Sequence, residues 1–235
     1  MIVSTHQPIL LPWPGFFYKA ARSDCMVLLD DVQFPRGASW LNRNRLKNET
    51  GGLWVTVPVW KKGRGLQKIC EVEVYDERGW RKKHLRSIEQ NYVHAPYLDT
   101  FHPSVAAAYA KNDRRLVEFN LRIIELLWEA LALPAKPILQ SSLGVTGGGT
   151  DLLIRICERL GADRYAVLPA GEKHIDSAQM RAAGIALEPL RFHPPVYPQL
   201  WGEFIYNLST LDLLLNCGPK SIEVISKAGS HEPPE

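Results

Sequence analysis

The sequence contains few cysteines, and they lie far apart. Only four of its 235 residues are cysteines, and none form a C-x-x-C pair: Cys25, Cys70, Cys157 and Cys217. Each falls in or beside an apolar run, which is typical of reduced, buried thiols rather than of disulfides or zinc ligands. We therefore expect a reducing, cytoplasmic location and no disulfide framework.

Long apolar runs are also absent. The most apolar helical segment, residues 116–133, carries Glu118, Arg122, Glu125 and Glu129, so we do not expect it to span a bilayer. The N-terminal residues lack the basic start and the continuous apolar stretch of a secretory signal. The sequence therefore predicts no membrane association.

Neither sign of charge dominates the chain. It has 28 basic and 25 acidic side chains, a formal net charge of +3, which argues against a protein that coats nucleic acid and leaves room for a local basic patch. Hydrophobic residues make up 46% and charged residues 23%, an ordinary globular composition that excludes general disorder. The 17 prolines, 7 tryptophans and 8 tyrosines predict rigid turns and aromatic-lined pockets.

The start of the chain has the pattern strand, helix, strand. Residues 2–5 and 25–29 are short apolar runs, and residues 16–23 between them have apolar positions at helical spacing. Such a βαβ unit has parallel strands and a right-handed crossover, and ligands bind beyond the carboxyl ends of its strands. We therefore expect the residues that follow the two strands, His6-Gln7 and Asp30-Asp31, to face one crevice.

The rest of the chain continues as a mixture of strands and helices. We expect strands at 53–59, 69–74, 136–140, 164–168 and 185–192. We expect helices over 80–92 and 105–132, from Thr150 to Gly161, and a short one that ends near Gly184. A last helix should run from Ser209, with Asp212 in a capping box, to Gly218. The prediction is one α/β domain over residues 1–218, a Rossmann-like parallel sheet with a mainly helical insertion at about 80–135, followed by a C-terminal tail at 219–235.

The ends of the first two strands supply the candidate catalytic groups. His6, with an ordinary pKa of about 6.5, suits proton transfer or phosphate binding. Asp30 and Asp31 suit a sugar hydroxyl, an amine or Mg²⁺. Neighbouring side chains of an extended chain point to opposite sides, so we expect one carboxylate in the site and the other at a turn. A purely structural role is the alternative for each group.

A basic, amide-rich stretch follows this unit. If it forms a strand, Arg43, Arg45 and Lys47 share one face as an anion clamp; the alternative is a solvated basic stretch. Other candidates for substrate or phosphate binding are polar, aromatic or glycine residues: Gln7, Trp13, Gly15, Lys19, Gln33, Asn42, Asn44, Tyr197, Gln199 and Glu203. The segment 141–151 could cradle phosphate at a helix N-terminus, but its glycines at 147–149 lack the Lys-Ser/Thr ending of a P-loop, so a plain loop is the favoured interpretation. The histidines lack metal-ligand spacing, so we expect no metal site.

Taken together, these segments resemble the WbqC-like protein family. The resemblance rests on 6–8 with 12–13 and 15–16, on 29–34, on 42–45 with Lys47, and on the later segments 141–142, 161–163 with Tyr165, 197–199 and 208–214. It implies a bacterial cytoplasmic protein of polysaccharide or amino-sugar pathways. At the level of the fold alone, the start of the chain is also similar to pantothenate synthetase and related nucleotidyltransferases. Their H-x-G-H turn corresponds to 13–16 here, where both histidines are absent and Gly15 remains.

These resemblances imply an enzyme, a transferase or an ATP-dependent amide ligase. It would join an acyl or aminoacyl group to the amine of a nucleotide-linked amino-sugar or a related metabolite, with Arg43, Arg45 and Lys47 on the phosphates. Activation by ATP with Mg²⁺, by aminoacyl-tRNA or as a thioester stays open, as does the oligomeric state. The alternatives are a nucleotidyltransferase acting on a sugar and a non-catalytic scaffold of a polysaccharide pathway.

Overall fold

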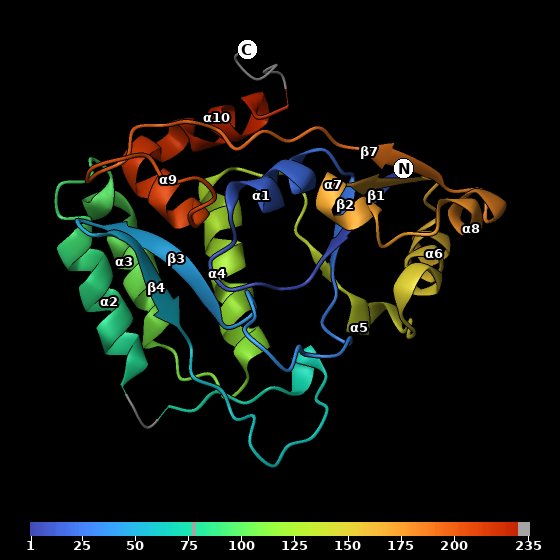
Figure 1. Ribbon diagram of the computed structural model, residues 1–235, viewed down its shortest axis with the longest axis horizontal. Helices are drawn as coiled ribbons and strands as arrows, with labels where there is room; N and C mark the ends of the chain where they lie inside the picture. The colour runs from blue at the N-terminus through green and yellow to red at the C-terminus, as the bar shows by residue number, and fades with distance from the viewer. Residues whose placement is uncertain (77–78, 230–235) are drawn as a thin grey trace.

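A parallel sheet forms one half of the molecule (Figure 1). The computed structural model describes residues 1–76 and 79–229. Within them, five strands pair in the order β5-β2-β1-β6-β7, all parallel. Their bounds are β1 (Ile2–His6), β2 (Cys25–Leu28), β5 (Ile138–Leu139), β6 (Arg164–Val167) and β7 (Ala186–Pro189). Helices flank this sheet, which confirms the predicted Rossmann-like α/β fold.

The helices and a hairpin complete the architecture. In chain order the α-helices are α1 (Pro14–Ala21), α2 (Trp80–Asn91), α3 (Leu98–Ala110), α4 (Leu116–Ala130), α5 (Gln140–Leu143), α6 (Gly149–Leu160), α7 (Pro169–Glu172), α8 (Ser177–Ala182), α9 (Thr210–Cys217) and α10 (Ser221–Lys227). Two 3₁₀ turns are η1 (Ile69–Glu71) and η2 (Gly218–Lys220), and β3 (Arg43–Asn48) pairs antiparallel with β4 (Gly51–Thr56). No helix among the described residues has the length and apolar character needed to cross a membrane.

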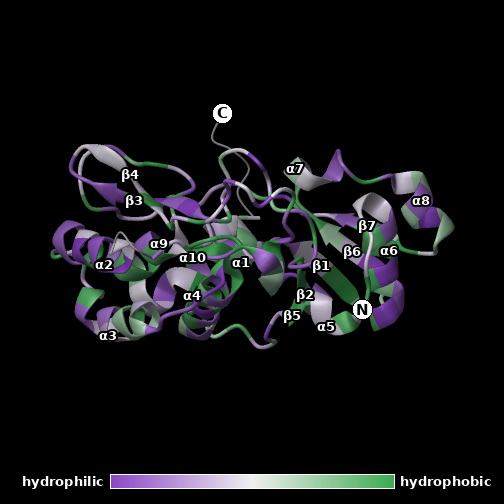
Figure 2. Cartoon of the chain, turned by 90° about the horizontal axis from the view of Figure 1, so that it is seen from below, coloured by the Kyte–Doolittle hydropathy of each residue, from purple (hydrophilic) through white to green (hydrophobic). Residues whose placement is uncertain are grey.

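The two faces of the sheet bury different hydrophobic cores. Successive side chains of a strand point to opposite faces. Tyr165 and Val167 of β6 accordingly join a core with residues of α6 and α8, while Ala166 between them joins a larger core that includes α1 and α4. Figure 2 shows the apolar colouring of the central strands that lie between these cores. Burial on both faces explains why the sequence of β2 is a continuous apolar run.

Helices α2, α3, α4 and α9 gather on the other half of the molecule, beside the β3–β4 hairpin (Figures 1 and 2). The single helix expected at 105–132 is wrong, because the chain turns between α3 and α4. Asp113 in this turn pairs with Arg122 of α4 and fixes the turn.

Several expected local structures differ from those observed. The strand expected at 69–74 is wrong: the amides of Ile69 and Cys70 bond back to the segment after β2, so the chain forms η1 there. The helix expected to start at Thr150 is capped by Gly148, and the Thr150 hydroxyl instead accepts from the Asp176 amide. Ser209 caps α9 as expected, but Asp212 does not complete a capping box.

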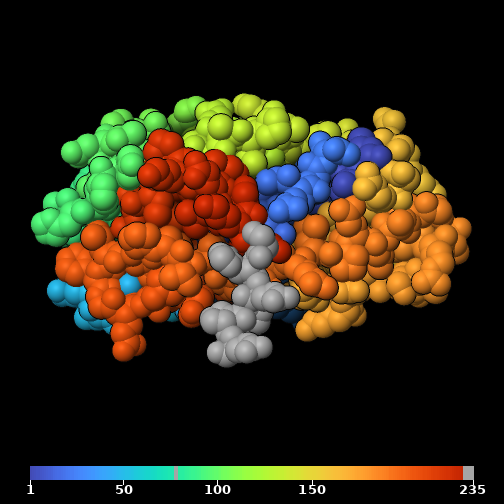
Figure 3. Space-filling view, turned by 90° about the horizontal axis from the view of Figure 1, so that it is seen from above, coloured from blue at the N-terminus to red at the C-terminus, as the bar shows by residue number. Residues whose placement is uncertain are grey.

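The segment expected to be a tail contains ordered helix. Helix α10 packs against α1, and Ile225 is fully buried in the larger core. Figure 3 shows the red C-terminal helices next to the blue α1. An apolar face on a short helix is enough to pack this segment against the core. Residues 230–235 of the expected tail lie outside the described residues.

Acid should destabilise the fold through His84, a buried residue of α2. Its Nε2 accepts the Thr56 amide at 3.2 Å, and burial lowers the pKa of His84 to about 4. The unfolded chain, with an ordinary pKa of about 6.5, then binds more protons between pH 6.5 and 4, so stability falls as the pH drops through that window. The slope is up to about 1.4 kcal/mol per pH unit.

Urea unfolding of the wild type and of His84→Gln at pH 7, 6 and 5 measures this slope. Glutamine can still accept the Thr56 amide but does not titrate, so the variant should lose less stability on acidification. Equal slopes for the two proteins would contradict the assignment.

Candidate functional site

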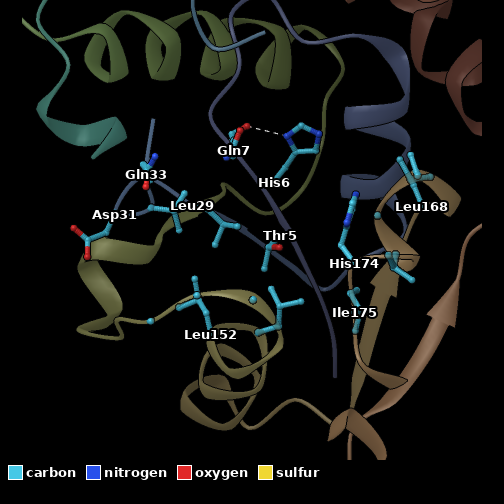
Figure 4. Close-up of a pocket in the computed structure, with 18 of the residues that line it drawn as sticks. Thr5, His6, Gln7, Leu29, Asp31, Gln33, Leu152, Leu168, His174 and Ile175 are labelled. Atoms are coloured by element: carbon cyan, nitrogen blue, oxygen red, sulfur yellow. Dashed lines mark hydrogen bonds between the residues drawn. The ribbon is translucent and has the colours of Figure 1, made fainter. Parts of the chain in front are cut away.

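A cleft opens at the carboxyl ends of β1, β2 and β6, with a volume of about 1160 Å³ (Figure 4). This is the edge of a parallel sheet at which ligands bind. The cleft contains four of the predicted residues that follow the first two strands: His6, Gln7, Asp31 and Gln33. It also contains Trp13 and Lys19, from the beginning and the body of α1.

The cleft lies where the sheet splits. Strand β1 pairs with β2 as far as His6, but with β6 only at Ile2 and Val3. The carbonyl of Met1 accepts an amide from the β6 side, whereas those of Ile2 and His6 accept amides from the β2 side. Since carbonyls alternate along a strand, that of Thr5 points toward β6, beyond the last paired residue. At this point, where β1 stops pairing with β6, the Thr5 carbonyl is therefore left without a partner among the described strands of the sheet.

Lys19 occupies this gap as a buried cation. Its Nζ donates to the Thr5 carbonyl at 2.6 Å, and the residue is 7% exposed. No carboxylate lies within ion-pair distance of Lys19 in the described part of the chain. Burial lowers the pKa of Lys19 to about 8. A charge held by a neutral carbonyl keeps most of its attraction for anions, so Lys19 is suited to bind an anionic group.

His6 is held as a neutral proton acceptor. Its Nδ1 lies 2.8 Å from the Gln7 carbonyl, shown dashed in Figure 4. A carbonyl can only accept, so Nδ1 carries the proton and Nε2 has a free lone pair. Burial, and then the charge of Lys19, lower the pKa of His6 to about 3. The ring also packs edge-on against Phe16, which fixes its orientation.

The two aspartates after β2 have different environments. Asp30 is buried and accepts both the amide and the hydroxyl of Ser141, at 2.9 and 2.6 Å. It does not line the cleft, and we do not propose it further as a catalytic group. Asp31 lines the cleft and forms an ion pair with Lys68, at 2.8 and 3.0 Å. Asp31 is therefore the carboxylate that the fold brings to the site.

Trp13 and Gly15 form the turn that enters α1. The indole of Trp13 lies over Gly15 so closely that a Cβ on Gly15 would be 2.2 Å from the ring. Gly15 does not line the cleft itself; its lack of a side chain lets Trp13 do so.

Residues 42–47 do not form a three-residue anion clamp. Arg43 and Arg45 lie on one face of the hairpin with Trp54 of β4. Lys47 is buried, and its Nζ donates to the Gln199 side chain at 3.0 Å and to a backbone carbonyl at 2.6 Å. Loop contacts from the C-terminal third therefore remove Lys47 from the clamp.

The candidates of the C-terminal third gather away from the cleft. Tyr197 and Tyr92 donate to the two carboxylate oxygens of the buried Asp212, at 2.8 and 2.6 Å. The carbonyl that accepts from Lys47 is that of Glu203, whose side chain is exposed. Tyr197, Gln199, Glu203 and Lys47 thus belong to a polar network that joins α2, α9 and the hairpin.

The asparagines of the basic stretch hold backbone. Asn44 Nδ2 donates to the carbonyls of Leu10 and Leu11, at 2.9 and 2.7 Å, in the loop between β1 and α1. Asn120 of α4 holds the same loop at the Pro8 carbonyl, at 2.7 Å. Asn42 donates to the Val57 carbonyl, and it does not line the cleft.

The fold adds residues to the site that were not among those expected there from the sequence. Gly147, Gly148 and Gly149 line the cleft at the N-terminus of α6, and φ values of 134° at Gly147 and 57° at Gly149 favour glycine there. His174, just after α7, lies across the cleft from Asp31 (Figure 4). The glycine run was visible as a pattern, but nothing near His174 in the sequence points to a site. The described residues contain no group of three or more His, Cys, Asp or Glu arranged to hold a metal ion.

Replacing Lys19 by methionine should remove anion binding at the cleft. We expect inorganic tripolyphosphate to raise the melting temperature of the wild type, since a ligand at a hundred times its Kd stabilises by about 2.7 kcal/mol. In Lys19→Met the affinity should fall at least about tenfold, or about 1.4 kcal/mol. Thermal unfolding with and without tripolyphosphate measures the shift in melting temperature of the wild type and of the variant.

Lys136→Met is the matched control, because Lys136 is exposed and precedes β5 at the opposite edge of the sheet. It should keep the wild-type shift. An unchanged shift in Lys19→Met would show that the cation does not bind the anion.

Comparison with known proteins places the chain in a family. A model of the WbqC-like protein family matches residues 7–224. The protein named "Uncharacterized protein Rv1507c", from Mycobacterium tuberculosis (strain ATCC 25618 / H37Rv), is 30% identical over 221 residues, 93% of this chain and 95% of that protein. No solved structure matches the chain. Because the family match spans most of its length and agrees with the motifs seen in the sequence, the chain belongs to the WbqC-like protein family.

Proposed function

We propose that this protein is an amide-forming enzyme, which transfers an acyl or aminoacyl group to the amine of a nucleotide-linked amino-sugar or a related metabolite. The observation that carries the proposal is a neutral histidine, His6, beside the buried cation Lys19 at the carboxyl edge of the sheet. A polysaccharide or specialised-metabolite pathway in the cytoplasm is the setting in which such a reaction would serve.

The chemistry of His6 suits the attack of an amine. The amine nitrogen forms a bond to the acyl carbon, Nε2 of His6 takes the proton that the nitrogen loses, and the leaving group departs with its electron pair. A positioned general base contributes about 10²- to 10⁴-fold to such a step. The hydrogen bond from Nδ1 to Gln7 keeps Nε2 free for this purpose.

The charges in the cleft suit an anionic leaving group. Lys19 and the glycine loop before α6 supply a cation and backbone amides at a helix N-terminus. If ATP activates the acyl group, Asp31 is the carboxylate in the cleft that would bind its Mg²⁺. Magnesium in proteins is commonly bound by one or two carboxylates together with substrate phosphates. An acyl group already activated on tRNA or as a thioester needs only Lys19 and the glycine loop.

The glycine loop also favours a second candidate, a nucleotidyltransferase acting on a sugar. Backbone amides at a helix N-terminus bind nucleotide phosphates, and the loop lies in the same cleft as Lys19. In this alternative a substrate phosphate attacks the α-phosphate of a nucleoside triphosphate and releases pyrophosphate.

An intact-mass assay tests the proposal. The full chain is incubated with nucleotide-linked amino-sugars, ATP, Mg²⁺ and amino acids, and with aminoacyl-tRNA and acyl thioesters in parallel reactions. We expect a product with the mass of the amide. His6→Gln should slow its formation at least about 100-fold, because glutamine has no titratable nitrogen.

His102→Gln is the control, because His102 pairs with Glu89 on the surface of α2 and α3, away from the cleft. It should keep wild-type activity. Pyrophosphate release without amide would favour the nucleotidyltransferase, and no product across the panel would favour a scaffold.

A further inference from the structure

A second chamber adjoins the main cleft and shares a wall with it. It has a volume of about 490 Å³, within the roughly 300–1,000 Å³ of small-molecule sites. Four residues line both spaces: His6, Gln7, Trp13 and Trp40. The histidine therefore stands at the junction of two chambers.

An exposed indole, Trp40, lines this chamber, and a second exposed indole, Trp54, packs against it. Trp40 is 49% and Trp54 is 45% exposed, and their ring centroids are 5.5 Å apart with an interplanar angle of 32°. Trp40 lines the chamber, and its backbone carbonyl accepts the Leu10 amide, which ties it to the loop between β1 and α1. An exposed indole such as that of Trp40 offers a face on which a planar group can stack.

Two arginines complete this platform. Arg45 lies directly across the hairpin from Trp54, and Arg43 is its diagonal neighbour on the same face. The guanidinium carbon of Arg43 lies 3.7 Å from the Trp54 ring centroid, and that of Arg45 lies 5.7 Å away. Stacking leaves the in-plane N–H groups of a guanidinium free to bind phosphate.

Neither arginine has a counter-ion in the described part of the chain. Among residues 1–76 and 79–229, no carboxylate is paired with Arg43 or Arg45. The Nε atoms of both are buried without a hydrogen-bond partner, and Arg45 makes one long contact, 3.4 Å, to the Tyr206 carbonyl. Arg45 lines the chamber. The platform thus combines aromatic faces with positive charge that nothing in the described chain neutralises.

We infer that the second chamber binds the nucleoside-phosphate part of a substrate, with the base on Trp40 and the phosphate on Arg45. A nucleotide matches both features at once, because it joins a planar base to an anion. A sugar phosphate would use the arginine alone. The inference deepens the proposed function. It rests on that function for one point only, namely that the bound nucleotide is part of the acceptor substrate. The acceptor amine would then reach His6 from one chamber and the activated acyl group from the other.

Calorimetric titration of the full chain with UDP, GDP and ADP, and with ribose 5-phosphate as a phosphate that lacks a base, tests the assignment. At least one nucleotide should bind, and Trp40→Ala should weaken it about tenfold or more, since base stacking contributes about 1–3 kcal/mol. Arg45→Gln should weaken the nucleotide and ribose 5-phosphate alike. Ribose 5-phosphate should bind more weakly than the nucleotide and be unaffected by Trp40→Ala.

Trp60→Ala is the matched control, because Trp60 is also exposed, at 40%, and lines neither chamber. Its affinity for the nucleotide should equal that of the wild type. Equal effects of Trp40→Ala and Trp60→Ala would overturn the inference. So would binding of a single-stranded RNA 3′ end without binding of free nucleotides, or a change of oligomeric state as the sole effect of Trp40→Ala.

The outcomes also separate this inference from the proposed function. Nucleotide binding that depends on Trp40 and Arg45, without any amide product, would support the chamber and contradict the reaction. Amide formation from a nucleotide-linked acceptor whose KM is unchanged by Trp40→Ala would support the reaction and contradict the chamber.

Discussion

Two buried asparagine amides hold the loop that follows β1, and the site depends on their hydrogen bonds. Asn44 reaches this loop from the hairpin and Asn120 reaches it from α4. Leu11 in the loop has a left-handed backbone, φ 46°, which costs a non-glycine residue about 1–2 kcal/mol. Its carbonyl is one of those held by Asn44, so the strained loop is fixed between the two halves of the molecule. The histidine at its start and the indole at its end are placed by the same bonds.

The position of the site follows from local patterns in the sequence. A short apolar run, an amphipathic stretch and a second apolar run predict a parallel pair, because such patterns depend on neighbours along the chain. The polar residues after each run then had to share one edge, and His6, Gln7, Asp31 and Gln33 do line the cleft. The location of the crevice needed no knowledge of distant contacts.

The roles of individual residues could not be predicted in this way, because they depend on contacts between distant segments. Lys47 alternates correctly with Arg43 and Arg45, yet it bonds to residues about 150 positions later and is buried. Asp212 has the spacing of a capping box, but two phenols that pack against α9 bind its carboxylate. Asp30 and Asp31 are neighbours, and only the approach of Ser141 separates their roles. Sequence spacing could not distinguish these cases.

The closeness of Lys19 to His6 makes the basicity of the histidine depend on what the cleft contains. Burial is the largest cause that lowers the pKa of His6, and the charge of Lys19 is the second. An anion bound against Lys19 would cancel that charge, and the histidine would become a stronger base at the moment a substrate arrives. A buried cation paired with a carbonyl instead of a carboxylate would thus let anion binding raise the basicity of the histidine without any movement of the chain.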